Sequence, residues 1–355
     1  MHTRIQHCRS HKPGQRNVLA SATTGFKEFT LRNGGAPERV FGRVGLNENQ
    51  LNDINEPLDL ASYVRMLELA ATETGNDNFG LWFGQQFKPE MLGLIGSVAL
   101  ASPTLGAALS NLARLFPYHQ QVTHTAFIRC GALVRLEYRI LDGAIIDRRH
   151  DAELTLGMFA NVLRHCLGGA WTPEALHFEH PKPIDPRAHM QAFAAPVFFG
   201  QGTNALVFRG DRLHHKMPNG DLSKANFVCE QLIRVAGGRG VLSLLDHVKG
   251  EIRSRLPHGI PYVEVIAERV GMPRWTLQRR LANHGLSFSD VVELVRRELA
   301  ERHIRQRFVP LSDIAHILGF SELSAFSRAF SRWFGVSPQR FRTNFLLSKY
   351  AEGVS

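Results

Sequence analysis

The sequence predicts two domains, an α+β domain followed by an all-α domain with two helix-turn-helix motifs. The chain has 355 residues, which is long for one domain and sufficient for two hydrophobic cores. Residues 237–240 read Gly-Gly-Arg-Gly, which suits a joint between domains better than the interior of a helix or strand. After this joint one helical pattern occurs twice, whereas helical and strand patterns are mixed before it.

Residues 1–24 are expected to form a disordered tail that precedes a folded domain over residues 25–236. The opening segment lacks an apolar core, so we do not expect a signal peptide. It carries four side chains that can bind metals, His2, His7, Cys8 and His11. A solvated tail is nevertheless the simpler interpretation. The most apolar stretch, residues 91–109, is interrupted by three glycines and a proline, so no membrane span is expected.

The first domain alternates between helical and strand-like patterns. Helices are expected within residues 57–82, from Ser102 to about Phe116, and over 147–167 and 222–235. A hairpin is expected from residues 122–128 and 133–140, and short strands at 175–178, 197–199 and 204–208. Along the second hairpin strand, apolar side chains alternate with Arg135, Glu137 and Arg139. Separated helices with antiparallel strands indicate an α+β domain.

The second domain begins with a helix predicted over residues 241–256, followed by a first helix-turn-helix motif over 262–285. Gly271 marks the turn of this motif. Its inward positions are Ile266, Ala267, Val270, Leu277 and Leu281. The outward face of its second helix carries Arg274, Trp275, Gln278 and Arg279. Core packing does not explain a tryptophan beside Gln and Arg, whereas these residue types suit DNA bases and phosphates.

A second motif, over residues 311–342, follows a linking helix predicted over 288–308. Such a helix would be roughly 30 Å long, close to one duplex turn of about 34 Å. Predicted helix caps are Ser312, Ser321 and Ser337. The inward positions are Ile314, Ala315, Leu318, Leu323, Phe326, Phe330 and Phe334. The outward face of the second helix carries Ser321, Ser324, Ala325, Arg328 and Arg332.

A solvated helix face in an ordinary bundle would explain either motif alone, but two copies favour a pair of DNA-reading helices. The distribution of charge agrees. The net charge is +10, and residues 241–355 hold 17 Lys and Arg against 11 Asp and Glu. More than half of the excess positive charge therefore lies in the last third of the chain, which points toward nucleic acid.

This last third, residues 241–345, resembles the DNA-binding domain of the AraC/XylS family of bacterial transcription regulators. The most specific part is DIAHILGFSELSAFSRAFSRWFGVSPQRFR, in which Phe341 replaces the Tyr common in the family. The resemblance implies that Trp275, Gln278 and Arg279 contact DNA in the first motif, and that Ser324 and Arg328 do so in the second. It also implies double-stranded DNA and RNA polymerase as partners, a homodimer, and more often activation than repression. Residues 346–355 are expected to be a tail.

Three stretches of the first domain, SPTLGAALSNLARLF, GGAWTPEALHFEHPKP and FAAPVFFGQGTNALVFRGDRL, resemble the arabinose-binding-like sensing domain of one branch of this family. Such relatives are associated with varied small molecules, including amino acids and amines, so the resemblance implies a small-molecule effector. The candidates for its pocket, by residue type alone, are Tyr118, Tyr138, Arg148, His150 and Trp171. For each of them a structural role, as a core aromatic or an ion-paired surface residue, is the stronger explanation. The alternative is a dimerisation or protein-interaction module that binds no ligand.

Catalysis, cofactors and metal binding are not expected. The cysteines, Cys8, Cys130, Cys166 and Cys229, are widely spaced without a CxxC pair. This spacing excludes a zinc ribbon and indicates a reducing cytoplasm. The chain has neither a GxSxG nor an HExxH motif. His177 and His180 would point to opposite faces of a strand, so we do not expect them to share a metal. An enzyme with an appended DNA-binding domain is the remote alternative.

Overall fold

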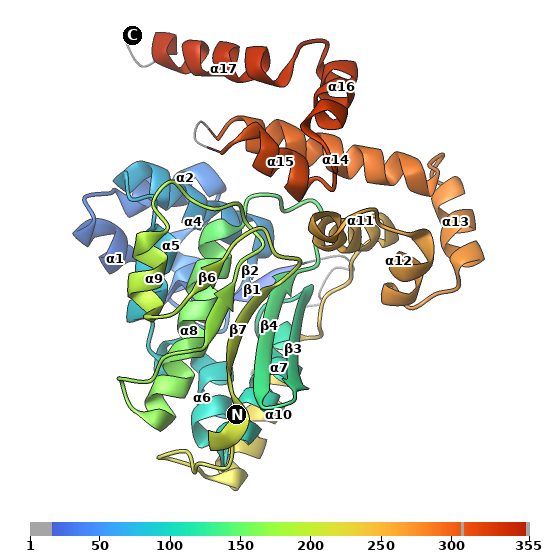
Figure 1. Ribbon diagram of the computed structural model, residues 1–355. Coiled ribbons are helices and arrows are strands. Elements are labelled where there is room, and N and C mark those ends of the chain that lie inside the picture. Colours follow the sequence, from blue (N-terminus) through green and yellow to red (C-terminus); the bar gives the residue numbers. More distant parts are fainter. Residues whose placement is uncertain (1–15, 307–308, 353–355) are drawn as a thin grey trace, which may run out of the picture.

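The structure, a computed structural model, describes residues 16–306 and 309–352 (Figure 1). It contains two hydrophobic cores, one built from residues 18–232 and one from residues 248–330. The two predicted fold types are confirmed: an α+β part with a mostly antiparallel sheet is followed by a purely helical part. No helix in the described ranges is long and apolar enough to cross a membrane. The candidate metal-binding side chains before residue 16 lie outside the described residues.

The main sheet of the first domain has five strands in the order β3-β4-β7-β5-β6. Their bounds are β3 Thr123–Cys130, β4 Leu133–Ile140, β7 Asn204–Arg209, β5 Ala175–His177 and β6 Val197–Phe198. Neighbouring strands are antiparallel except β5 and β6. The predicted hairpin is thus β3 and β4, and β7 pairs with its second strand. A separate antiparallel pair joins β1 (Asn17–Leu19) to β2 (Pro57–Asp59).

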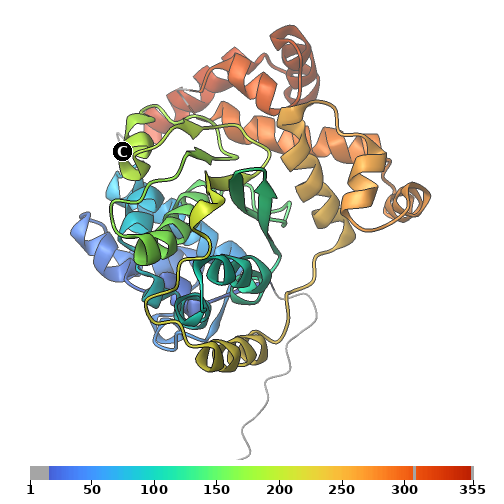
Figure 2. The same ribbon diagram turned by 60° about the horizontal axis from the view of Figure 1, so that its bottom comes forward.

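Helices cover one face of this sheet. The helices of the first domain are α1 Phe26–Arg32, α2 Pro37–Val44, α3 Glu48–Leu51, α4 Leu60–Thr74, α5 Phe79–Gln86, α6 Gly93–Ala101, α7 Leu105–His119, α8 Arg149–Leu167, α9 Arg187–Phe193 and α10 Leu222–Ala236. α7 and α8 pack on the sheet, and α10 packs on α6 and α7, on the side away from the second domain (Figure 2). On β4, Leu136 and Tyr138 are buried beneath these helices, whereas Arg135 and Glu137 lie on the other face, as the alternation predicts.

α5 and α8 cross in direct backbone contact, which fixes the start of α8. A Cβ atom on Gly80 would lie 2.3 Å from the carbonyl oxygen of His150, and one on Gly157 would lie 2.7 Å from Gly84. Only glycine permits such an approach. This contact holds the first turns of α8, which carry several buried polar side chains.

Two expectations for the first domain are wrong in detail. Residues 17–23 form β1 and a 3₁₀ turn (η1, Ala20–Thr23), and Val18 is fully buried, so the folded domain begins before residue 25. The helix expected from Ser102 begins at Leu105 instead, and its N-cap is Thr104, whose hydroxyl accepts a hydrogen bond from the backbone N–H of Ala107 at 3.2 Å.

The second domain contains α11 Leu244–Arg255, α12 Val263–Arg269, α13 Arg274–Ala282, α14 Phe288–Ile304, α15 Leu311–Ile317, α16 Leu323–Phe334 and α17 Pro338–Glu352. The two predicted helix-turn-helix motifs are the pairs α12/α13 and α15/α16, joined by α14 (Figure 1). Leu277, Phe326 and Phe330 are fully buried, as the inward pattern predicts. Leu323, also predicted to face inward, is 43% exposed at the first position of α16, so its inward assignment is wrong.

The ends of several of these helices differ from the prediction. α14 ends at Ile304 and has 17 residues, so it measures about 25 Å rather than 30 Å. Phe308, expected at its end, lies outside the described residues. Pro310 and Glu322, not Ser312 and Ser321, occupy the cap positions of α15 and α16.

The start of α17 is as predicted, and its end is not. The hydroxyl of Ser337 accepts a hydrogen bond from the backbone N–H of Arg340 at 3.3 Å, which makes Ser337 the cap. The helix then continues through Glu352, so most of the expected tail over residues 346–355 is helical.

Candidate nucleic-acid interface and effector pocket

α13, the second helix of the first motif, presents a mixed aromatic and basic face. The Trp275 side chain is 62% exposed, although tryptophan is usually buried. The Arg279 guanidinium lies 5.0 Å from the centre of the Trp275 ring, a cation–π contact that orients both groups. Gln278 is exposed on the same helix. Arg274 forms an ion pair with Glu264 of α12 at 2.6 Å, so its charge is partly engaged within the motif.

α16, the second helix of the other motif, presents small polar side chains and arginine. Ser321, Ser324 and Arg328 are exposed, and Arg328 forms no ion pair among the described residues. Arg332 instead turns toward α14, where Glu293 accepts hydrogen bonds from Arg332 at 2.9 Å and from Trp333 at 2.7 Å. Arg332 is therefore partly held by the fold, and Arg328 is the freer of the two cations.

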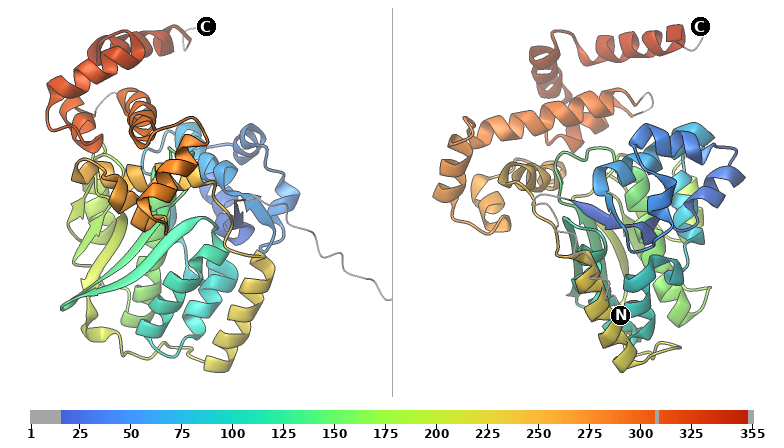
Figure 3. Two further views of the ribbon diagram at one scale, coloured as in Figure 1. Left: turned by 90° about the vertical axis from the view of Figure 1, so that its right-hand side faces the viewer. Right: turned by 180° about the vertical axis from the view of Figure 1, so that it is seen from behind.

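The positions of α13 and α16 follow from α14, which runs between them (Figure 3). Val291 and Val295 of α14 are fully buried in the core that both motifs share. One continuous helix therefore sets the distance between two exposed helices of the type that enters a major groove.

Comparisons with known proteins agree with this geometry. A family model described as "Arabinose-binding domain of AraC transcription regulator, N-term" matches residues 34–217, and one described as "Helix-turn-helix domain" matches residues 266–344. The chain belongs to the AraC family of transcription regulators. It is 30% identical over 331 residues to the HTH-type transcriptional regulator VirS of Mycobacterium tuberculosis. The aligned region covers 92% of this chain and 96% of VirS.

Another relative of this AraC-family regulator is the ornithine utilization regulator of Pseudomonas aeruginosa, 24% identical, with 87% of this chain and 91% of that protein covered. The crystal structure of CdpR from Pseudomonas aeruginosa is similar at 19% identity and a TM-score of 0.41, covering 89% of this chain and 98% of CdpR. The protein is a DNA-binding transcription regulator with an arabinose-binding-like first domain, and its relatives and domains are those of regulators rather than enzymes.

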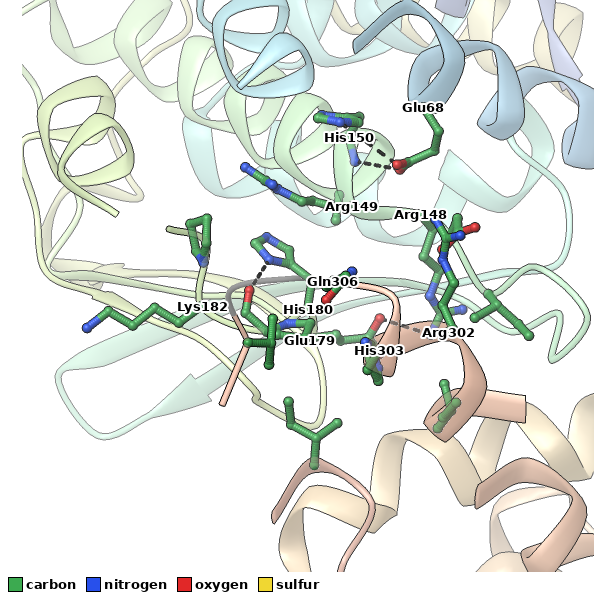
Figure 4. Close-up of a pocket in the computed structure, with 18 of the residues that line it drawn as sticks. Glu68, Arg148, Arg149, His150, Glu179, His180, Lys182, Arg302, His303 and Gln306 are labelled. Atoms are coloured by element: carbon green, nitrogen blue, oxygen red, sulfur yellow. Dashed lines mark hydrogen bonds and ion pairs between the residues drawn. The ribbon is translucent and has the colours of Figure 1, made fainter. Parts of the chain in front are cut away.

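A cavity of about 490 Å³ lies between the two domains of this AraC-family regulator. Figure 4 shows side chains of the first domain on one side and of α14 on the other. The first domain contributes Glu68, Asp147, Arg148, Arg149, His150, Glu179, His180 and Lys182. The second domain contributes Arg253, Leu299, Arg302, His303, Gln306, Val309 and Ile317. A volume of this size suits a small metabolite.

The charges in this cavity are mixed and mostly held in place. Arg148 donates a hydrogen bond to the carbonyl of Ile140 and forms an ion pair with Glu179 at 3.0 Å. Arg302 of α14 forms an ion pair with Asp147 across the domain boundary. Burial lowers the pKa of His303 to about 4, so this imidazole is neutral near pH 7. The cavity thus offers both signs of charge and a neutral imidazole.

Only two of the five candidate pocket residues line this cavity, Arg148 and His150. Tyr138 is fully buried in the first core, and its hydroxyl donates to Asp151 at 2.5 Å. Tyr118 instead lies beneath Arg239, at 5.0 Å. Trp171 packs against Phe208 with 6.0 Å between ring centres. Residue type could not distinguish a cavity aromatic from a core aromatic, and these three do not line this cavity.

Sequence reasoning missed the cavity residues on the second domain. Arg253 lies on α11, where it donates to the carbonyls of Ile145 at 2.7 Å and Gly143 at 2.5 Å. Burial lowers its pKa to about 9. Arg302 and His303 lie on α14, which the sequence presents as a link between DNA-reading motifs. No local pattern indicates that this helix also faces the first domain.

α11 is docked on the first domain by buried contacts. Arg139 of β4 forms an ion pair with Glu251 of α11 at 2.5 Å, and the two side chains are only 7% and 3% exposed. Nearby, the backbones come into contact: a Cβ atom on Gly250 would lie 2.1 Å from the carbonyl oxygen of Leu141. The domain interface is therefore built from a buried charge pair and a glycine contact.

The Gly-rich segment over residues 237–240 is also bound to the first domain. The side-chain amide of Gln121 donates to the carbonyls of Ala236 at 3.2 Å and Gly238 at 3.1 Å. The backbone N–H of Val122 donates to the carbonyl of Arg239 at 3.0 Å. The glycines provide the positive φ angles that this path requires, with φ values of 65° at Gly237 and 140° at Gly238.

A buried polar cluster lies behind the cavity, centred on Glu153 of α8. Its carboxylate is fully buried; Arg149 donates to Oε1 at 2.8 Å, and Nε2 of His189 lies 2.6 Å from the same oxygen. Burial opposes the charge of Glu153, but the charge of Arg149 and the hydrogen bonds outweigh it and hold the pKa of Glu153 below its ordinary value. His180 lies on the other side of this oxygen, at 3.5 Å, and burial lowers the pKa of His180 to about 3.

Proposed function

We propose that this protein activates transcription in response to a small metabolite that binds in the cavity between its two domains. The main support for this proposal is that residues of both domains line one cavity. A ligand there would contact α14, which also sets the distance between α13 and α16. A ligand that prefers one arrangement of the domains would thereby change the population competent to bind DNA.

The lining favours a zwitterion or an amine with a carboxylate as effector. Acidic side chains such as Glu68 and Glu179 and basic ones such as Arg149 and Lys182 line the same cavity of about 490 Å³. An amino acid presents an ammonium and a carboxylate at a separation that such a lining can match. The name of one relative, the ornithine utilization regulator, refers to an amino acid of this type.

The proposal assigns effector binding and dimerisation to the residues before 237, the joint to 237–240, and DNA binding to those after 240, with RNA polymerase as the further partner. One DNA-binding domain offers two short reading helices. Two copies would double the contacted length of DNA and raise the effective affinity.

The effector assignment is tested on the full-length protein by thermal shift and calorimetry with amino acids, diamines and short organic acids, with monosaccharides as comparison. A binding compound should lose affinity at least tenfold with Lys182→Met and not with Lys224→Met, an exposed control on α10. If no compound in a broad panel binds, the first domain is better explained as a ligand-independent dimerisation or protein-interaction module.

The DNA assignment is tested with Gln278→Ala and Arg328→Ala. Each should weaken operator binding by about 1–3 kcal/mol and relax selectivity at base pairs one turn apart. Arg209→Ala, an exposed cation at the end of β7, serves as the control and should leave binding unchanged. Footprints in which both variants alter the same base pair would refute the assignment of one reading helix to each motif.

A further inference from the structure

We propose that Glu153, His180 and His189 form a binding site for a divalent transition metal ion such as Zn²⁺, inside the first domain and beside the interdomain cavity. These residues come from three separate elements. Glu153 is on α8, His180 follows β5, and His189 is on α9. One ligand atom of each lies within 4.8 Å of the others. Two imidazoles and one carboxylate are a common protein ligand set for zinc.

The distances require little movement to close around an ion. Nε2 of His180 lies 3.5 Å from Oε1 of Glu153, and Nε2 of His189 lies 2.6 Å from it. Ligand atoms about 2.0–2.1 Å from a tetrahedral ion stand about 3.3 Å apart. The first distance already fits, and the second must open by less than 1 Å.

The tautomer of His180 points a lone pair into the cluster. Its Nδ1 lies 2.9 Å from the carbonyl oxygen of Pro181, and a carbonyl can only accept, so Nδ1 carries the hydrogen. Nε2 is then an acceptor, and it is buried without a hydrogen-bond partner among the described residues. Metal-bound histidines are typically oriented in this way, with the other ring nitrogen bonded to a backbone carbonyl.

The carboxylate of Glu153 also has a free oxygen. Oε2 is buried and accepts no hydrogen bond in the part of the chain that the structure describes. The nearest ring nitrogen, Nδ1 of His150, lies 3.5 Å away and accepts the backbone N–H of Gly80 at 3.1 Å. This oxygen and Nε2 of His180 are thus two buried acceptors of one cluster, and neither has a donor among the described residues. A cation there would satisfy both.

Arg149 has two opposite effects on metal binding: its positive charge repels a cation, and it also keeps the Glu153 carboxylate ionised. It donates to Oε1 of Glu153 at 2.8 Å, and its other end pairs with Asp77 at 3.2 Å. Its positive charge lowers the affinity for an ion, and Asp77 offsets part of that charge. A carboxylate oxygen has two lone pairs, so Oε1 can accept from Arg149 and still bind the ion. Three protein ligands also leave a fourth position of a tetrahedral ion for water.

The test is Co²⁺ binding by full-length protein prepared with a chelator. The expected result is one tightly bound ion with the intense visible bands of tetrahedral Co²⁺, displaced by Zn²⁺. His180→Gln and His189→Gln should each weaken binding at least tenfold, and the control His177→Gln, on β5, should not. To exclude the opening segment, these variants are made in a chain whose His2, His7, Cys8 and His11 are replaced by serine.

A second measurement keeps all three proposed ligands, so it does not require the histidine variants to fold. X-ray absorption on the zinc-loaded chain with the serine replacements should show the scattering of two imidazoles and light oxygen ligands. Absence of stoichiometric Co²⁺ binding, a Co²⁺ spectrum unchanged in folded His180→Gln and His189→Gln, or a zinc spectrum without imidazole scattering would each overturn the proposal.

Discussion

Glu251→Gln should uncouple the two domains by breaking the ion pair between α11 and β4. Oε1 of Glu251 lies 2.5 Å from Arg139, and its Oε2 lies 3.2 Å from Arg269, whose side chain is 44% exposed. Arg139 is 7% exposed, so the substitution leaves a buried guanidinium without a counterion. Breaking such a buried pair on one side costs about 3–5 kcal/mol.

Variants of the partner residue separate the cost of burying an unpaired charge from the cost of lost packing. Arg139→Met should cost less than Glu251→Gln, because Glu251 keeps Arg269 as a partner. Arg139→Met combined with Glu251→Met removes both buried charges, and should restore stability to near that of the unmodified chain or above it. Glu301→Gln, which breaks the exposed pair with Arg305, is the control and should change stability by less than about 1 kcal/mol.

The assay is urea unfolding of the full-length chain, with hydrogen exchange followed in β4 and α11. The pH dependence of the unfolding free energy gives a second test of the same ion pair. Burial opposes the charge of Glu251, but Arg139 and Arg269 outweigh it and hold its pKa below the ordinary value of 4.5. A lowered pKa means that the pair stabilises the fold above pH 4.5 and that this stability is lost as pH falls through the lowered value. Glu251→Gln should lack that loss. A change below about 0.5 kcal/mol would refute the reasoning, since it would be typical of a surface pair.

Three further predictions concern other parts of the fold. Phe326→Ala should cost about 3–5 kcal/mol and abolish the cooperative melt of the second domain in calorimetry, and an unchanged melt would contradict the assigned helix face. Burial raises the pKa of Asp151 to about 6, so the folded state binds its proton more tightly than the unfolded state, and stability should fall as pH rises from 4 to 6. Asp151→Asn should flatten that slope in urea titrations while keeping an acceptor for Tyr138; an unchanged slope would exclude Asp151 as its source. Gly250→Ala would place a Cβ against the carbonyl of Leu141, and should increase hydrogen exchange along α11 without lowering the helix content measured by circular dichroism.

The second domain was predictable because its information is local. Helical spacing identified Leu277 and Phe326 as buried, and the same pattern left Trp275 and Arg328 on the exposed faces, where the structure has them. The errors fell at helix ends. A serine such as Ser321 is a common cap, but the neighbouring backbone decides which residue precedes the first turn, and here it is Glu322.

The cavity was not predictable because its walls come from segments far apart in the chain. Glu68, His180 and Arg302 meet only after α4, the loop after β5 and α14 have packed together. Composition suggested aromatic residues, yet Trp171 packs against the sheet instead. The Glu153 cluster escaped notice for the same reason, since its three residues follow no motif spacing.

Because α14 belongs both to the proposed effector site and to the core of the DNA-binding domain, it restricts how a biosensor built on that proposed site could be re-engineered. Its residues Leu299 and Arg302 form part of the cavity wall, while Val295 of the same helix supports both reading motifs. A change on this wall that admits a new compound would also disturb the output at the promoter. The wall around Glu68 and Lys182 belongs to the first domain alone. Libraries that vary those positions should yield new input specificities with the promoter response preserved, so directed evolution of this regulator is best begun there.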